Sequence, residues 1–237
     1  LARRQELVDK FRIKPFVDNF SAIKNSDVII FAVKPQIIRD VISPLTDYLV
    51  ERKSLLLSIA AGISIKNIES WVSQDTAIVR AMPNSASLVR GGITALCSNS
   101  KTSREQLDRA ESIMLAIGKT VWLQDEVLMD AVTAISGSGP AYFFYLMEAL
   151  EQAAIIGGLD KNTARLLTLE TALGAARLAT ETNESPSSLR KMVTSPGGTT
   201  AAAMEVLDNN GAVETIKEAV LAAQNRSRNL EHPPRDE

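Results

Sequence analysis

VIIFAV, at residues 28–33, is the stretch of sequence that decides the fold. It is continuously apolar and rich in β-branched side chains, which is typical of a strand buried on both faces of a parallel sheet. Lys34-Pro35 ends this run. Two further strand patterns follow at residues 54–60 and 77–82. The first half of the chain therefore predicts a buried parallel sheet.

Helical patterns alternate with these strands. The expected helices cover residues 36–51, residues 65–71 with Ser64 as N-cap, and a segment that Thr102 caps and that Gly118 closes after Ile117. Two shorter strands are expected at residues 92–97 and 120–123. Strands separated by helices form βαβ units, which bind ligands outside the carboxyl ends of the strands. Those ends are Lys34-Pro35, Ala60-Ala61-Gly62 and Met82-Pro83-Asn84. Small residues and prolines are common at the turns of any such sheet, so these ends alone favour no particular ligand.

The second half of the sequence is helical. Beyond Asp125 alanine and leucine dominate, which predicts a dinucleotide-binding domain over residues 1–124 and a helical domain over 125–237. The expected helices run from 127 to 157 with an interruption at 136–140, and over 161–182, 187–193, 200–209 and 212–230. Their apolar surface indicates burial against another subunit, with the core of a monomer as the alternative.

The composition excludes several classes of function. With 26 basic and 28 acidic residues in 237, the net charge of −2 leaves no basic stripe for nucleic acid. No apolar run approaches the roughly 18 residues that span a bilayer, so no membrane association is expected. A single cysteine, Cys97, excludes an internal disulfide and a thiolate metal cluster and fits a reducing cytoplasm. The only histidine, His232, lies in the charged tail, which excludes a core histidine as base or metal ligand.

Two glycine-rich segments interrupt the helical half. They are Ser136-Gly137-Ser138-Gly139-Pro140 and Thr194-Ser195-Pro196-Gly197-Gly198-Thr199-Thr200. Each precedes a helix, so backbone N–H groups, hydroxyls and the positive end of a helix dipole come together. One such segment is usually an N-cap with a turn, but two of them favour a shared anionic small molecule.

These segments also carry a resemblance to a known family. Ser136–Tyr142 and Ser195–Thr200 resemble the two signature segments of pyrroline-5-carboxylate reductase, and Ala32–Pro35 and Ala60–Gly62 are similar to its cofactor-side loops. The resemblance covers essentially the whole chain. It implies a partial Rossmann-type parallel sheet followed by a helical domain that interlocks with its partner in a homodimer, often assembled into larger rings. It further implies hydride transfer from NADPH to the imine carbon of 1-pyrroline-5-carboxylate, which gives L-proline.

By the same resemblance, eight residues bind the cofactor, seven around its nicotinamide half and one, Asn19, near the adenine. The seven are Ala32, Val33, Lys34, Pro35, Ile59, Ala60 and Ala61. For Val33 and Ile59 the alternative is that the side chains serve the core while the backbone alone meets the cofactor.

The resemblance also implies a substrate site. Its residues are Glu126, Thr133, Ser136, Ser138, Gly139, Thr199 and Thr200. Ser138 and Thr200 are the expected catalytic residues, and Thr200 matches a threonine that hydrogen-bonds the ring nitrogen. The alternative for Thr200 is an N-cap of the following helix, and the alternative for Glu126 is a solvated side chain.

The sequence departs from the family in one respect. It contains no Gly-x-Gly-x-x-Gly loop to seat a pyrophosphate, so we expect it to begin inside the Rossmann half and to bind NADPH weakly as written. Arg3 and Arg4 then fall where a 2′-phosphate is recognised, which favours NADP over NAD, although an Arg-Arg pair is more often a solvated helix charge.

Two rival functions remain at this stage. A β-hydroxyacid dehydrogenase has a lysine one turn after the last glycine of its glycine-rich helix, whereas this chain has Phe143. A non-catalytic dimeric binding module would explain the missing glycine loop, but the intact Ser138 and Thr200 argue against it. Imine reduction also suits a chain without a core histidine, because an imine arrives protonated and needs no strong acid.

Overall fold

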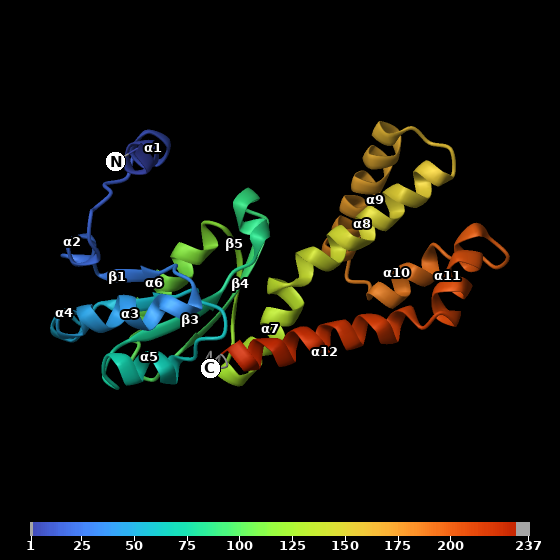
Figure 1. Cartoon of the computed structure of the whole chain (residues 1–237). Helices are drawn as coiled ribbons and strands as arrows, with labels where there is room; N and C mark the ends of the chain where they lie inside the picture. The colour runs from blue at the N-terminus through green and yellow to red at the C-terminus, as the bar shows by residue number, and fades with distance from the viewer. Residues whose placement is uncertain (1, 231–237) are drawn as a thin grey trace, which may run out of the picture. The chain divides into compact units, whose positions relative to one another are not determined.

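The computed structural model describes residues 2–230; residue 1 and residues 231–237, His232 among them, lie outside the described part. The described residues form two compact units. One unit comprises residues 2–137 together with 224–230, and the other comprises Ser138–Ala223 (Figure 1).

A five-stranded sheet runs through the first unit in the order β1-β2-β3-β4-β5. The strands are β1 (Val28–Phe31), β2 (Leu55–Ser58), β3 (Ile78–Met82), β4 (Gly92–Ser98) and β5 (Gly118–Trp122). The first three strands are parallel, with Phe31 opposite Ser58 and Ser58 opposite Arg80. The five strands expected from the sequence are therefore confirmed.

One pair of strands departs from the expected parallel sheet. β4 runs antiparallel to β3, with Met82 opposite Ala95, and β5 is parallel to β4. The link from β3 to β4 contains only a short 3-10 helix, η3 (Ser85–Val89). A parallel return needs a crossover of about a dozen residues or more, usually with an α-helix, so the shorter link turns the chain straight back. The expectation of a wholly parallel sheet is wrong for this pair.

Helices cover both faces of the sheet (Figure 1). On one face lie α3 (Ile38–Ile42), α4 (Thr46–Arg52) and α5 (Ile65–Trp71), and on the other lies α6 (Arg104–Leu115). Successive residues of β2 serve opposite faces, because side chains alternate along a strand. Leu56 packs with the first group of helices, whereas Leu55 and Leu57 pack with α6, and all three are fully buried.

Pro44 divides the helix that we expected over residues 36–51. The chain forms η1 (Pro35–Ile37), α3, η2 (Ser43–Leu45) and α4 in its place. Pro44 has no N–H for the helical ladder, and its ring clashes with the preceding turn, so the α-helical hydrogen bonding is interrupted there.

The cap of α6 also differs from the expected one. Ser103, not Thr102, is the N-cap, and its hydroxyl accepts a hydrogen bond from the N–H of Gln106 at 3.3 Å in a capping box. The Thr102 hydroxyl donates instead to the carbonyl of Ile78. Gly118 does not close α6 but begins β5, where a Cβ would lie 2.0 Å from the carbonyl oxygen of Gly92. Only glycine fits between these two strand starts.

The remaining elements of the first unit precede the first strand or follow the last one in the sequence. They are α1 (Ala2–Phe11), α2 (Asn19–Ile23), η4 (Glu126–Leu128), α7 (Met129–Val132) and the π-helical turn η5 (Thr133–Gly137). Met129 is fully buried in the core of the sheet, so the segment from η4 to η5 belongs to the first unit although it follows the last strand.

The second unit is built of helices. They are α8 (Gly139–Ile156), α9 (Lys161–Glu181), α10 (Pro186–Met192), α11 (Thr199–Asn209) and α12 (Ala212–Leu230), whose end from residue 224 belongs to the first unit. Gly158 and Gly211 follow α8 and α11 with φ of 98° and 65°. This left-handed backbone is the usual way for a glycine to end a helix.

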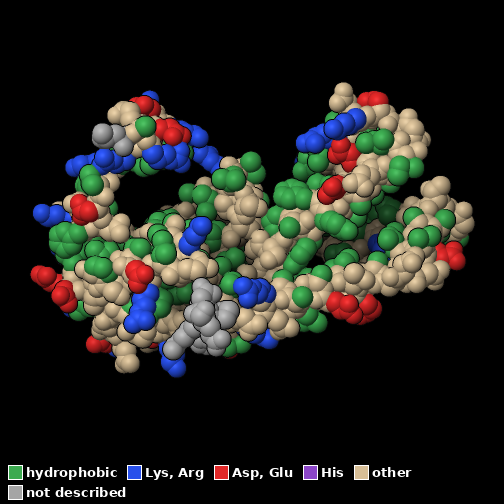
Figure 2. Space-filling model, in the orientation of Figure 1, with side chains coloured by type: hydrophobic (Ala, Val, Ile, Leu, Met, Phe, Trp, Pro, Cys, Tyr) green, Lys and Arg blue, Asp and Glu red, His purple; other side chains and the backbone are tan. Residues whose placement is uncertain are grey.

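Apolar side chains of the second unit are largely exposed. Within Ser138–Ala223 only Gly139, Ala164 and Thr168 are buried, whereas Phe143 is 65% and Leu166 is 61% exposed. Figure 2 shows apolar side chains at the surface of these helices. Monomeric proteins rarely expose so large an apolar surface, so the unit as described lacks a core of its own. No helix in residues 2–230 is long and apolar enough to cross a membrane.

Candidate functional site

The carboxyl ends of β1, β2 and β3 lie side by side at one edge of the sheet. The register of the three parallel strands fixes this arrangement, and the N–H of Ile59 donates to the carbonyl of Phe31 at 3.1 Å. The structure therefore brings together the seven residues that the sequence assigned to the nicotinamide half. Ala32 and Lys34 are exposed, Ala60 is buried, and Val33, Pro35, Ile59 and Ala61 are half-buried.

Asn19 is not brought to this edge. It begins α2, which precedes the amino end of β1, and its neighbour Phe20 packs against Tyr48 of α4 with ring centroids 5.1 Å apart. Nη1 of Arg3, on α1, donates to both carboxylate oxygens of Glu6 at 2.8 Å on the exposed surface of its own helix.

The first signature segment opens in a π-helical turn. In η5 the Thr133 hydroxyl donates to the carbonyl of Met129 at 2.8 Å, and the Ser136 hydroxyl donates to that of Val132 at 3.1 Å. A Cβ on Gly137 would lie 2.6 Å from Cε of Met82, at the carboxyl end of β3. The turn therefore reaches the same edge as the cofactor residues. π-helical turns of this kind are frequent at functional sites.

The first signature segment continues into the start of α8. Ser138 is the N-cap residue, but its side chain makes no capping hydrogen bond. Gly139 is buried, and Pro140 lies in the first turn, where its missing N–H is not needed. The Ser138 hydroxyl therefore makes no capping hydrogen bond with α8 that would compete with a ligand.

The second signature segment leads into α11. Gly197 has φ of 69°, so the turn requires glycine there. A Cβ on Gly198 would lie 2.6 Å from Oγ of Ser195 and 3.2 Å from the Ser195 carbonyl oxygen, so this position is tightly packed as well. Gly198 is the N-cap, and Thr199 and Thr200 are the first two residues of the helix. The alternative of Thr200 as the N-cap is therefore wrong, because the turn places the cap two residues earlier. N–H groups of the first helical turn have no partner within the helix, which suits an anion.

The predicted substrate residues are divided between the two units. Glu126, Thr133 and Ser136 belong to the first unit, and the remaining four, Ser138, Gly139, Thr199 and Thr200, belong to the second.

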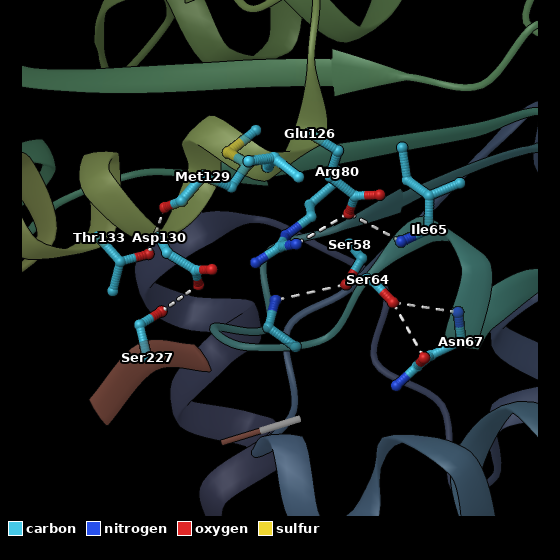
Figure 3. A network of polar contacts seen from close by, with 12 residues as sticks. Ser58, Ser64, Ile65, Asn67, Arg80, Glu126, Met129, Asp130, Thr133 and Ser227 are labelled. Carbon is cyan, nitrogen blue, oxygen red and sulfur yellow. Dashed lines mark hydrogen bonds and ion pairs between the residues drawn. The ribbon is translucent and has the colours of Figure 1, made fainter. Parts of the chain in front are cut away.

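Glu126 lies in a polar network that the sequence did not reveal (Figure 3). Its Oε1 accepts hydrogen bonds from Nη1 of Arg80 and from the N–H of Ile65, each at 2.8 Å. The Arg80 side chain is 5% exposed, so this ion pair is nearly buried. The signal that could have found it was an arginine inside the apolar run of β3, because a charged side chain in a buried strand needs a partner.

The environment of Cys97 gives it no role in chemistry. The thiol is buried on β4, and this burial, together with the negative charge of Glu126, raises its pKa above the usual range. A thiol that stays protonated at neutral pH is a poor nucleophile.

The arrangement defines a class of protein. A mostly parallel sheet with helices on both faces, small residues at adjacent strand ends and a following helical unit is typical of two-domain oxidoreductases that use a dinucleotide. The family model described as "NADP oxidoreductase coenzyme F420-dependent" matches residues 1–62. The family model described as "Pyrroline-5-carboxylate reductase dimerisation" matches residues 126–230.

Full-length relatives narrow this class to one family. A pyrroline-5-carboxylate reductase from Pseudomonas aeruginosa is 42% identical over 96% of this chain and 83% of the relative. The solved structure of one from Coxiella burnetii is 44% identical, with a TM-score of 0.90 over 97% of this chain and 85% of that one. A Plasmodium falciparum pyrroline carboxylate reductase solved with NADP bound is 31% identical, with a TM-score of 0.87 over 94% and 84% of the two chains. This chain belongs to the pyrroline-5-carboxylate reductase family.

Proposed function

We propose that the protein reduces 1-pyrroline-5-carboxylate to L-proline with NADPH as the hydride donor. The observation that carries this proposal is the pair of signature segments, each of which presents hydroxyls and glycine backbone at the start of a helix in a chain of this family. A solved relative has NADP bound, which supports the choice of cofactor.

The residues at the strand ends fit the nicotinamide half of such a cofactor. Ala32 and Ala61 leave the backbone accessible, because their side chains are too small to cover it, whereas Ala60 is buried, and Gly62 turns the chain away with φ of 70°. An uncharged ring packs well against short apolar side chains. We propose that these alanines, with Val33, Lys34, Pro35 and Ile59, hold this half of the cofactor and that Asn19 serves the adenine side.

The signature segments suit a small anionic substrate. We propose that the N–H groups and hydroxyls at Ser138–Gly139 and Thr199–Thr200 bind it, with Thr133, Ser136 and Glu126 completing the set. Hydroxyl groups both donate and accept, so they can hold a carboxylate and also meet a protonated ring nitrogen. In the proposed reaction Thr200 contacts that nitrogen, and Ser138 orients the ring.

The chemistry demands little proton transfer from the protein. When bound, NADPH supplies the hydride that the imine carbon accepts, and the nitrogen already carries its proton. Neither signature segment contains a carboxylate, lysine or histidine. The work left to this chain is to bind the carboxylate, orient the ring by hydrogen bonds and exclude water.

We also propose a homodimer formed through the helical domain, which the match to a dimerisation family and the exposed apolar side chains of α8 and α9 support. The division into a cofactor domain over residues 1–124 and a helical domain over 125–237, and a cytoplasmic location, remain part of the proposal.

Parallel steady-state assays test this function. The full-length protein is given NADPH with 1-pyrroline-5-carboxylate, and NADP with a β-hydroxyacid. We expect turnover of the imine and none of the hydroxyacid. Turnover of the hydroxyacid alone would replace the proposal with the rival dehydrogenase.

A further inference from the structure

The turn after β2 is held from outside by a helix that lies far along the chain. Gly62, the last residue of this turn, is buried and has φ of 70°. A Cβ on Gly62 would lie 2.6 Å from Cβ of Leu230 and 3.4 Å from the carbonyl oxygen of Ser227. The end of α12 therefore packs directly on the turn, and glycine is required there both by the backbone conformation and by this close approach.

A partly buried hydrogen bond holds the end of α12. The Ser227 hydroxyl donates to Oδ1 of Asp130 on α7 at 2.7 Å (Figure 3). Ser227 is 2% exposed, and the Asp130 side chain is 22% exposed. Arg228, which is largely exposed, approaches the other oxygen of Asp130 only to 3.9 Å. Ser227 is thus the principal partner of this carboxylate on α12, and a hydrogen bond to a charged acceptor is among the stronger ones.

The chain just after this turn is held by a second carboxylate, which precedes Asp130 in the sequence. Glu126 lies four residues before Asp130 and accepts the N–H of Ile65, the first residue of α5. Arg80 fixes the Glu126 carboxylate in turn. Two carboxylates from the segment that links the sheet to the signature turn therefore act on this stretch, Glu126 directly at Ile65 and Asp130 through the packing of α12 on Gly62.

We infer that Asp130 and Ser227 are positioning residues for the cofactor, because they hold α12 on Gly62 and thereby fix the backbone of Ala60 and Ala61. The inference rests on the proposed function, in which these alanines meet the nicotinamide half. A turn of two alanines and a glycine has no long side chain with which to anchor itself. The Ala60 N–H donates to Oγ of Ser58 at 3.3 Å, and beyond this hydrogen bond the position of the turn depends on what packs against it. Hydride transfer tolerates little error in the placement of the reacting atoms.

The test compares four variants with the wild-type full-length protein. Ser227→Ala and Asp130→Ala remove the hydrogen bond. Asp130→Asn keeps an acceptor oxygen and should therefore behave nearly like the wild type. Arg228→Gln is the matched control, because it changes a neighbour on α12 that does not make the short contact.

Two readouts that do not depend on turnover are measured first. NADPH affinity is obtained by fluorescence titration, and amide hydrogen exchange is followed in the peptide that contains residues 59–65. We expect Ser227→Ala and Asp130→Ala to speed exchange in this peptide and to weaken NADPH binding roughly threefold to tenfold, the range of one lost hydrogen bond. Asp130→Asn and Arg228→Gln should stay within about twofold of wild type. In the steady state, KM for NADPH should rise while KM for the imine stays nearly constant.

Either of two results would overturn the inference. Unchanged exchange and affinity in Ser227→Ala would mean that the hydrogen bond does not hold the turn. Faster exchange with unchanged NADPH affinity would mean that the Ser227–Asp130 hydrogen bond stabilises the turn but does not position the cofactor. If the wild type binds NADPH but does not reduce the imine, the proposed function fails, whereas the effect of the variants on NADPH affinity still decides this inference.

Discussion

Among single residues, Thr200 gives the most direct test of the proposed substrate site. It lies in the first turn of α11, and Gly198, not Thr200, caps that helix, so its hydroxyl is free of the capping role. Thr200→Val keeps the shape of the side chain and removes the hydroxyl. We expect kcat/KM for the imine to fall by about 1.5–3 kcal/mol in transition-state free energy, with little change in NADPH affinity. Loss of cofactor affinity with unchanged substrate affinity would assign this residue to the other ligand.

Arg80 is the residue whose loss should most affect stability. Oε1 of Glu126 accepts from both Arg80 and the N–H of Ile65. In Arg80→Met only the Ile65 N–H remains as its donor. Removing one partner of a nearly buried pair destabilises a fold, here by about 2–4 kcal/mol because Glu126 retains some exposure. Urea unfolding measures this change. Lys101→Met removes an exposed ion pair with Asp75 and serves as the control, for which we expect little change. Equal stability of the two variants would contradict the account of Arg80.

At the scale of elements, the apolar pattern of a segment predicts where a strand forms but not the direction in which it runs. The runs in β2 and β3 read as buried strands because both of their faces are covered, and all three strands form at the expected positions. β1 is buried on one face only, since Ile30 is 45% exposed, so the expectation of burial on both faces is wrong for this strand. The antiparallel direction of β4 was missed because direction depends on the length of a connection and not on the strand itself. The broken helix at Pro44 was open to prediction, since a proline in mid-helix removes a donor.

The candidate site shows the same division. Its glycine-rich segments were visible, because glycines and a proline contradict the helical pattern around them. The sequence did not show the π-helical form of Thr133–Gly137 or the contact of Gly137 with Met82, since both depend on residues distant in sequence. The pair Ser227 and Asp130 is separated by 97 positions and carries no local signal.

The small-residue face of α9 yields a prediction about assembly. Ala172, Ala175, Ala176 and Ala179 are spaced at i, i+3, i+4 and i+7 and share this face, and at the nearby Gly174 a Cβ would meet nothing within 4 Å in the single chain. We propose that another subunit packs closely here. Ala175→Trp would overfill such an interface and should split the oligomer, whereas the same change would be harmless on a solvated face. Light scattering that finds an unchanged assembly would contradict this placement.

On the scale of the whole molecule, the two units carry different parts of the proposed reaction. The first unit supplies the strand ends for the cofactor, and the second supplies the start of α8 and of α11 with their hydroxyls. A hydroxyacid dehydrogenase would need a proton acceptor beside these segments, and Phe143 stands at the position where that class has lysine. The absence of a carboxylate, lysine or histidine from both segments favours a substrate that brings its own proton.

The most direct test of this account follows the hydride itself. The full-length protein is incubated with NADPH that carries deuterium at the transferable position, together with 1-pyrroline-5-carboxylate, and the product is analysed by mass spectrometry. We predict proline with one deuterium, bound to the ring carbon that was the imine carbon, and one NADP formed for each proline. Proline without deuterium, or oxidation of NADPH without any proline, would contradict the assignment of this chain as an imine reductase.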